Sequence, residues 1–174
     1  MQRFEVCALV RLAREALAEE GHGGDSCALA ISRVPRKKVI RIAFDSPHTY
    51  GRRGACWYDE HHAFARLLSA QFDARVHAYV LDPEEFEKVT TYAAGRPVGG
   101  ETLRYDEVDP PTDAVDENAF EEIKSRWPLG YLARILGVTR SELIRLPRAP
   151  SVLLDLGGAA PQGELTDILP PPAW

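Results

Sequence analysis

The apolar residues near the N-terminus constrain the fold most, because their spacing has the period of one regular element. From Phe4 to Glu20 they recur at intervals of three and four residues, as on one face of an α-helix. Gly21 follows the last of them, and glycine commonly ends a helix. The sequence therefore predicts an amphipathic helix with one buried face, whose buried residues are Val6, Leu9, Val10, Ala13, Ala16 and Leu17.

The apolar pattern then changes to alternation, which is typical of β-strands. Ser26 to Arg33 and Val39 to Phe44 each place apolar residues at every second position. Pro35 to Lys38 lies between these runs and combines a turn-forming residue with charge. The two runs predict a β-hairpin whose inward residues are Cys27, Leu29 and Ile31, then Ile40, Ile42 and Phe44.

The middle of the chain predicts a second helix and a second hairpin. Asp59 can cap a helix with an apolar stripe, and Val76 to Leu81 follows as a strand. Asp82 to Glu85 has an N-cap residue, proline and glutamate in the order that starts a helical turn. The stripe residues are Phe64, Leu67, Leu68 and Phe72; the expected hairpin comprises Val89 to Ala93, a turn over Gly95 to Gly100 and a strand over Glu101 to Val108.

These elements predict an α+β fold, with a mainly antiparallel sheet of two hairpins and a central strand, packed helices and a small helical C-terminal section. At 174 residues and 45% hydrophobic content, the chain can bury one core, so we expect a single globular domain over residues 1–174. Val152 to Leu156 can add a short strand. We expect a cytoplasmic protein without a membrane span, because no apolar run approaches 18 residues.

Charge divides the C-terminal third into three segments. Asp106 to Glu122 carries eight acidic residues and no basic one, whereas Lys124 to Arg148 carries six basic residues and one acid. Within the latter, Lys124 to Leu146 predicts a helical hairpin, and a proline-rich tail runs from Pro147 to Trp174. The net charge of −5 gives no overall attraction to phosphate backbones or anionic membranes.

The segment from Leu129 to Leu146 resembles a helix-turn-helix. Ala133 is the small residue where two helices would cross, and Gly137 can adopt the positive φ of the turn. The resemblance implies that the exposed face of the second helix contacts DNA through Arg140, Ser141 and Arg145. Pro147 and Glu142 oppose DNA reading, because the proline ends the helix early and the glutamate repels phosphate. A purely structural helical hairpin is the alternative.

Residue types used in catalysis gather between Asp45 and His62. Imidazole, thiol and carboxylate groups together could bind zinc or build a nucleophile with its base, as in a small hydrolase or nuclease. The spacing matches no metal-ligand pattern, so we expect no metal and no cofactor, and a polar loop is the alternative. The residues are Asp45, His48, Tyr50, Arg52, Arg53, Cys56, Asp59, Glu60, His61 and His62.

The acidic segment is the best sequence candidate for a binding surface. Clustered carboxylates steer a positively charged partner at low salt. The layout of the chain resembles small bacterial immunity or adaptor proteins, which neutralise a partner by covering it. We therefore expect a non-catalytic protein-binding module that contacts a protein partner through Asp113, Asp116, Glu117 and Trp174, with DNA binding and hydrolysis as alternatives.

Overall fold

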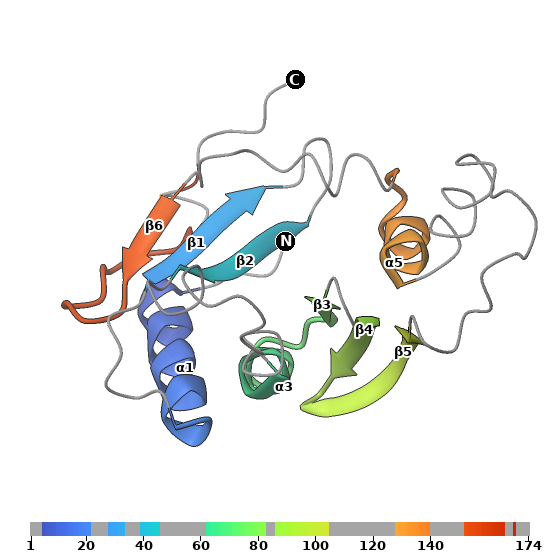
Figure 1. Cartoon of the computed structure of the whole chain (residues 1–174). Coiled ribbons are helices and arrows are strands. Elements are labelled where there is room, and N and C mark those ends of the chain that lie inside the picture. Colours follow the sequence, from blue (N-terminus) through green and yellow to red (C-terminus); the bar gives the residue numbers. More distant parts are fainter. Residues whose placement is uncertain are drawn as a thin grey trace, which may run out of the picture.

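The structure, a computed structural model, describes residues 5–21, 28–33, 39–45, 62–82, 86–104, 128–139, 152–165 and 169. This part of the chain forms an α+β fold with two small antiparallel sheets of three strands each and helices packed against them (Figure 1). The elements are α1 (Val6–Glu19), β1 (Ala28–Arg33), β2 (Ile40–Asp45), α3 (His62–Gln71), β3 (Val76–Asp82), β4 (Phe86–Ala93), β5 (Arg96–Arg104), α5 (Pro128–Leu136) and β6 (Val152–Asp155).

The first sheet has the strand order β2-β1-β6. The predicted hairpin is confirmed, since β1 pairs antiparallel with β2. The short strand near the C-terminus is confirmed as well, and its place is on the other side of β1, where Leu29 is opposite Leu154. The inward residues Leu29, Ile31 and Leu154 are buried against α1. Residues more than 100 positions apart in the sequence therefore share one sheet.

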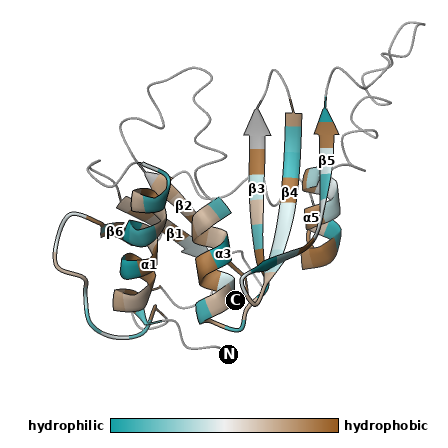
Figure 2. Cartoon of the chain, turned by 90° about the horizontal axis from the view of Figure 1, so that it is seen from below, coloured by the Kyte–Doolittle hydropathy of each residue, from teal (hydrophilic) through white to brown (hydrophobic). Residues whose placement is uncertain are grey.

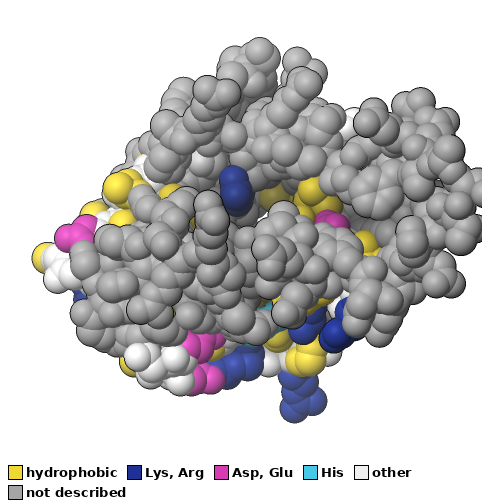
Figure 3. Space-filling model, in the orientation of Figure 1, with side chains coloured by type: hydrophobic (Ala, Val, Ile, Leu, Met, Phe, Trp, Pro, Cys, Tyr) yellow, Lys and Arg dark blue, Asp and Glu magenta, His cyan; other side chains and the backbone are white. Residues whose placement is uncertain are grey.

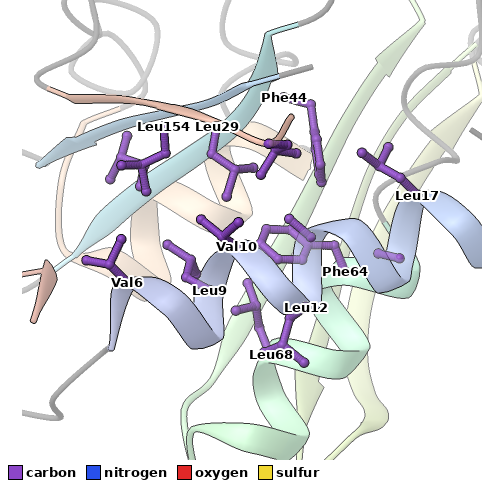
Figure 4. Packing of buried hydrophobic residues seen from close by; sticks show 14 of the residues in the cluster. Val6, Leu9, Val10, Leu12, Leu17, Leu29, Phe44, Phe64, Leu68 and Leu154 are labelled. Carbon is purple, nitrogen blue, oxygen red and sulfur yellow. The ribbon is translucent and has the colours of Figure 1, made fainter. Parts of the chain in front are cut away.

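Helix α1 covers the inner face of this sheet. All six residues predicted for its buried face are buried, and Leu12 joins them. Figure 4 shows Val6, Leu9 and Val10 of α1 on the side of Leu29 and Leu154 of the sheet, whereas Leu12 lies beside Leu68 of α3. The ring of Phe44 meets the ring of Phe64 from α3 edge to face, with centroids 5.1 Å apart. Each large apolar side chain buried in this way contributes about 1.5–3 kcal/mol.

The second sheet has the strand order β3-β4-β5 and corrects several sequence predictions. The strand expected at the centre of a single sheet, Val76 to Leu81, is instead the first strand of this separate sheet. Asp82 ends β3 rather than starting a helical turn, and residues 83–85 lie outside the described residues. The reason is that antiparallel strands connected in sequence pair locally, so three successive strands complete a meander.

The turn between β4 and β5 is shorter than predicted. Ala94 and Gly95 have φ values of 48° and 75°, and positive φ at both central residues is typical of a two-residue hairpin turn. Consequently β5 begins at Arg96, and Gly99 and Gly100 lie inside the strand. A Cβ atom at Gly100 would collide with the carbonyl oxygen of Val89, so this glycine permits the close approach of β5 to β4.

Helices α3 and α5 both pack on the second sheet. In Figure 2, α3 lies between α1 and the second sheet, and it contacts both of them. Ser69, which is fully buried in α3, donates a hydrogen bond to the carbonyl of Arg66 and accepts one from the amide of Gly95 at 3.0 Å. The turn of the second sheet is thus fastened to the helix that also packs in the first core.

Helix α5 forms a second apolar cluster with the sheet, and its end agrees with the predicted glycine turn. Gly137 has a φ of 63°, and the amide of Val138 donates to the carbonyl of Ala133 at 3.0 Å. The amide of Gly137 donates to Arg134 at 3.2 Å, which completes a Schellman motif. The buried residues of the cluster are Val89, Leu129, Leu132 and Ala133. The predicted second helix, over residues 140–146, lies outside the described residues.

Candidate functional site

A row of polar side chains lies on the face of the second sheet that α5 covers. Alternate residues of a strand share a face, and in β4 this face carries Glu87, Val89 and Thr91, all of which are buried. The register places Tyr79 of β3 opposite Val89 and His77 opposite Thr91. Four polar residues of two strands are therefore brought together around one apolar residue, next to a helix end.

Glu87 is the centre of this row. Its side chain is only 5% exposed, and Oε1 accepts a hydrogen bond from the amide of Leu129 at 2.7 Å. The hydroxyl of Tyr79 donates to the same oxygen at 3.1 Å. Leu129 follows Pro128 in the first turn of α5, where the amides have no partner within the helix. Glu87 therefore caps α5 from a strand, and its negative charge is favourable at the positive end of the helix dipole.

His77 and Thr91 form the other half of the row. His77 Nδ1 lies 2.9 Å from Thr91 Oγ1, across the β3–β4 pair. Burial lowers the pKa of His77 below its ordinary value of 6.5, and the positive charge of Arg75 lowers it further. A lowered pKa keeps the imidazole neutral at pH 7. The hydrogen bond with Thr91 therefore joins a neutral imidazole to the neighbouring strand.

A second polar junction joins α1, α3 and β4. Glu20 at the end of α1 accepts a hydrogen bond through Oε1 from the amide of Ala63, 3.0 Å away, and so caps α3 from another element. Glu19 pairs with Arg66, with Nη2 to Oε2 at 2.7 Å. Figure 3 shows acidic and basic side chains adjoining one another at the lower margin of the face in view. These contacts fasten α3 to α1.

His62 and Tyr92 complete this junction. His62 Nδ1 lies 2.9 Å from the hydroxyl of Tyr92, which is 8% exposed. Burial raises the pKa of Tyr92 above its ordinary value, and the charge of Arg66 offsets part of that rise. The hydroxyl of Tyr92 therefore stays neutral, and its hydrogen bond with His62 joins β4 to α3.

Both polar groups join elements of the fold through hydrogen bonds. Each carboxylate caps a helix, and each histidine is hydrogen-bonded to a hydroxyl in β4. In the described residues, no three His, Cys, Asp or Glu side chains are grouped as a metal ion would require. The histidines are also held at separate places, His77 between β3 and β4 and His62 between α3 and β4.

Sequence reasoning missed Glu87, which organises the α5 junction. It started the strand at Val89 and assigned the preceding acids to a helical turn, whereas β4 begins at Phe86. The signal in the sequence was that Glu87, Val89 and Thr91 occupy every second position, as the residues on one face of a strand do. Alternation shows that these residues share a face, but it does not show that a helix more than 40 positions later covers that face.

Most residues predicted for binding or catalysis lie outside the described part of the chain. These are Asp113, Asp116, Glu117 and Trp174 for a protein partner, and Arg140, Ser141 and Arg145 for DNA. Of the polar loop, His62 is described in full and Asp45 only as the last residue of β2. The structure therefore places His62 next to Tyr92. The roles expected for the other site residues stay predictions.

Strand β5 is the most exposed regular element among the described residues. Every residue from Arg96 to Thr102 is exposed, as is Arg104, while Leu103 is half-buried. In the order of the second sheet β5 is an outer strand, with β4 as its neighbour on one side. Three large apolar side chains of the described residues are exposed: Val98 at 59%, Ile135 at 44% and Leu153 at 55%.

Comparisons with protein-family models, with curated proteins and with solved structures found no match. Among the described helices, none has the length and apolar character needed to cross a membrane.

Proposed function

We propose that this protein is a non-catalytic protein-binding module of the immunity or adaptor kind, which holds a protein partner through its acidic, divided C-terminal third. The observation that carries the proposal is the position of β5. This exposed strand ends at Arg104, and the acidic segment begins two residues later, at Asp106. In the sequence, the eight carboxylates of that segment therefore follow directly after an exposed outer strand of the second sheet.

The polar groups of the described body support the same proposal. Glu87 and Glu20 are engaged as caps of α5 and α3, and His77 and His62 are bound to hydroxyl groups. A buried carboxylate that caps a helix stabilises the fold, and moving it to reach a substrate would release the helix amide it holds. These contacts support a role of the described part of the chain as a base for a charged binding segment.

The experiment is capture of a partner by the full chain in its native host, followed by a measured stoichiometry. Neutralising Asp113, Asp116 and Glu117 to the matching amides should abolish the complex, and Trp174→Ala should weaken it. Glu15→Gln is the matched control, because this exposed acid of α1 pairs with Arg11 on the surface. A chain that remains a free monomer and binds nothing would contradict the proposal, as would a complex that survives the triple substitution.

One observation favours DNA binding as a second candidate. Gly137 follows the last residue of α5 and has a φ of 63°, the backbone conformation that a helix-turn-helix requires in its turn. This function predicts that duplex DNA is shifted at low salt and that Arg140→Ala or Arg145→Ala weakens the shift. Binding that is absent at low salt would exclude it.

A further inference from the structure

One end of the second sheet carries two arginines that have no acidic partner among the described residues. Arg75 directly precedes β3, and Arg96 is the first residue of β5; both are exposed. Within the described part of the chain, the arginines found in ion pairs are Arg11 and Arg66. Figure 3 shows several basic side chains grouped at the lower margin of the face in view, where Figure 1 has the second sheet. Two positive charges at one end of a sheet are therefore available to an anion.

The strand register brings both arginines to the face that α5 borders. Arg96 pairs with Ala93, which shares a face of β4 with Thr91, two positions earlier. Burial and then the charge of Arg75 lower the pKa of His77, so Arg75 lies near that ring. The ring is in turn hydrogen-bonded to Thr91. The two arginines therefore flank the His77–Thr91 pair, one from each side of β4.

Gly99 leaves space beside this pair. It is opposite Thr91 in the register and is exposed. Among the described residues, a Cβ atom built on Gly99 would have one neighbouring atom within 4 Å, the hydroxyl oxygen of Tyr131 at 4.0 Å. Tyr131 belongs to α5 and is half-buried, and its hydroxyl has no hydrogen bond to another described residue. A hydroxyl donor therefore faces the space over Gly99, close to the arginines.

These groups match the chemistry of a phosphate monoester. A guanidinium presents its N–H donors in a planar fork that fits phosphate oxygens, and a phenol hydroxyl can donate to a further oxygen. A phosphate monoester carries a charge of about −1.5 to −2 at pH 7, which two arginines balance, whereas a carboxylate carries a single charge. Glu101 is exposed on the same face, two positions beyond Gly99, and repels anions from that half. The site is therefore confined to the arginine end.

We propose that this end of the second sheet binds the phosphate group of a phosphomonoester through Arg75 and Arg96, with the hydroxyl of Tyr131 as a further donor. Gly99 leaves room for the ligand beside the His77–Thr91 pair. The inference goes beyond the proposed function, because it uses none of the residues expected to hold a protein partner.

The test uses the full chain with phenyl phosphate as the probe, at low salt and about pH 7.5, where the monoester is mainly dianionic. Benzoate is the control ligand, because it keeps the ring and replaces the dianion with a monoanion. A short single-stranded oligothymidylate tests whether phosphodiesters bind instead. Affinity is measured by isothermal titration calorimetry, and NMR shifts of the backbone amides locate the site.

We expect phenyl phosphate to bind and to shift the amides between Ala93 and Gly99. Arg75→Gln and Arg96→Gln should each weaken binding roughly tenfold, because each removes a charged hydrogen bond. Tyr131→Phe keeps the ring and should weaken binding roughly threefold. Arg11→Gln is the matched control, since this exposed arginine of α1 pairs with Glu15 and should leave the affinity unchanged.

Four results would overturn the inference. The first is that phenyl phosphate does not bind, and the second is that both folded arginine variants bind it as the wild type does. The third is that benzoate binds as tightly as phenyl phosphate, because the site would then not recognise the phosphate group. The fourth is that the oligothymidylate binds more tightly than phenyl phosphate and loses affinity in the same variants, which would assign the surface to nucleic acid.

Discussion

Replacing Glu87 with alanine should destabilise the protein substantially, because two donors lose the same acceptor. The Leu129 amide lies 2.7 Å and the Tyr79 hydroxyl 3.1 Å from Oε1, and the carboxylate itself is 5% exposed. An unsatisfied buried donor costs about 1–3 kcal/mol, and the half-buried Tyr79 can recover some hydration. We therefore expect Glu87→Ala to lower the free energy of unfolding by about 2–4 kcal/mol, which is roughly 5–15 °C in melting temperature for a domain of this size.

The assay is urea unfolding followed by circular dichroism, with hydrogen exchange of the α5 amides as a local readout. Glu87→Gln keeps an acceptor oxygen and loses only the charge, so its cost should be nearer 1 kcal/mol. Tyr79→Phe removes one donor and should cost about 0.5–1.5 kcal/mol. The reasoning is refuted if Glu87→Ala unfolds within about 0.5 kcal/mol of the wild type, or if exchange of α5 is unchanged.

Three further predictions concern the second sheet and its junction with α3. Ser69→Ala should lower the free energy of unfolding in urea by about 1–2 kcal/mol, since the amide of Gly95 loses its acceptor. Ser69→Thr is the control, because it keeps the hydroxyl. Ala94→Asn should raise the melting temperature by the equivalent of about 0.5–1 kcal/mol, because asparagine tolerates positive φ better than alanine does; an unchanged or lower value would contradict the assigned turn. Because the pKa of His77 is lowered in the folded protein, the unfolded chain takes up the proton first as the pH falls below 6.5, and the free energy of unfolding then decreases. His77→Gln should therefore flatten the change in urea midpoint between about pH 7.5 and 5.5. An identical slope in both proteins would contradict this explanation.

The elements with strong local periodicity were predictable. Val6, Leu9 and Ala13 predicted the buried face of α1, and the alternation of Leu29 and Ile31 predicted β1. A side chain's direction follows the backbone period, so a window of ten residues already specifies which side chains share a face. The α+β class followed from these elements.

The division into two sheets was not predictable from the same patterns. Val76 to Leu81 has the alternation of any half-buried strand, and nothing in it distinguishes pairing with β4 from pairing across the first sheet. Likewise, Val152 to Leu156 could have been a strand of either sheet. Pairing partners are selected by packing between whole elements, which a single strand does not encode.

The turn at Ala94 and Gly95 shows a related limit. Three glycines and a proline between residues 94 and 101 suggested a long turn, yet two residues form the turn and the other two glycines lie in the strand. Gly100 is needed because β4 passes too close for a Cβ atom, which depends on the neighbouring strand. A glycine in a sequence indicates conformational freedom without indicating what requires it.

The chain's own sequence therefore specified the periodic faces, the acidic segment and the glycine at the end of α5. Only the tertiary structure decided what the acidic side chains of the body do: Glu87 caps a helix 42 residues away, and Glu20 caps another 43 residues away. A carboxylate's role depends on the donors around it, and those donors come from elements that meet only when the chain is folded. Side-chain periodicity is local, whereas the environment of a buried charge is not.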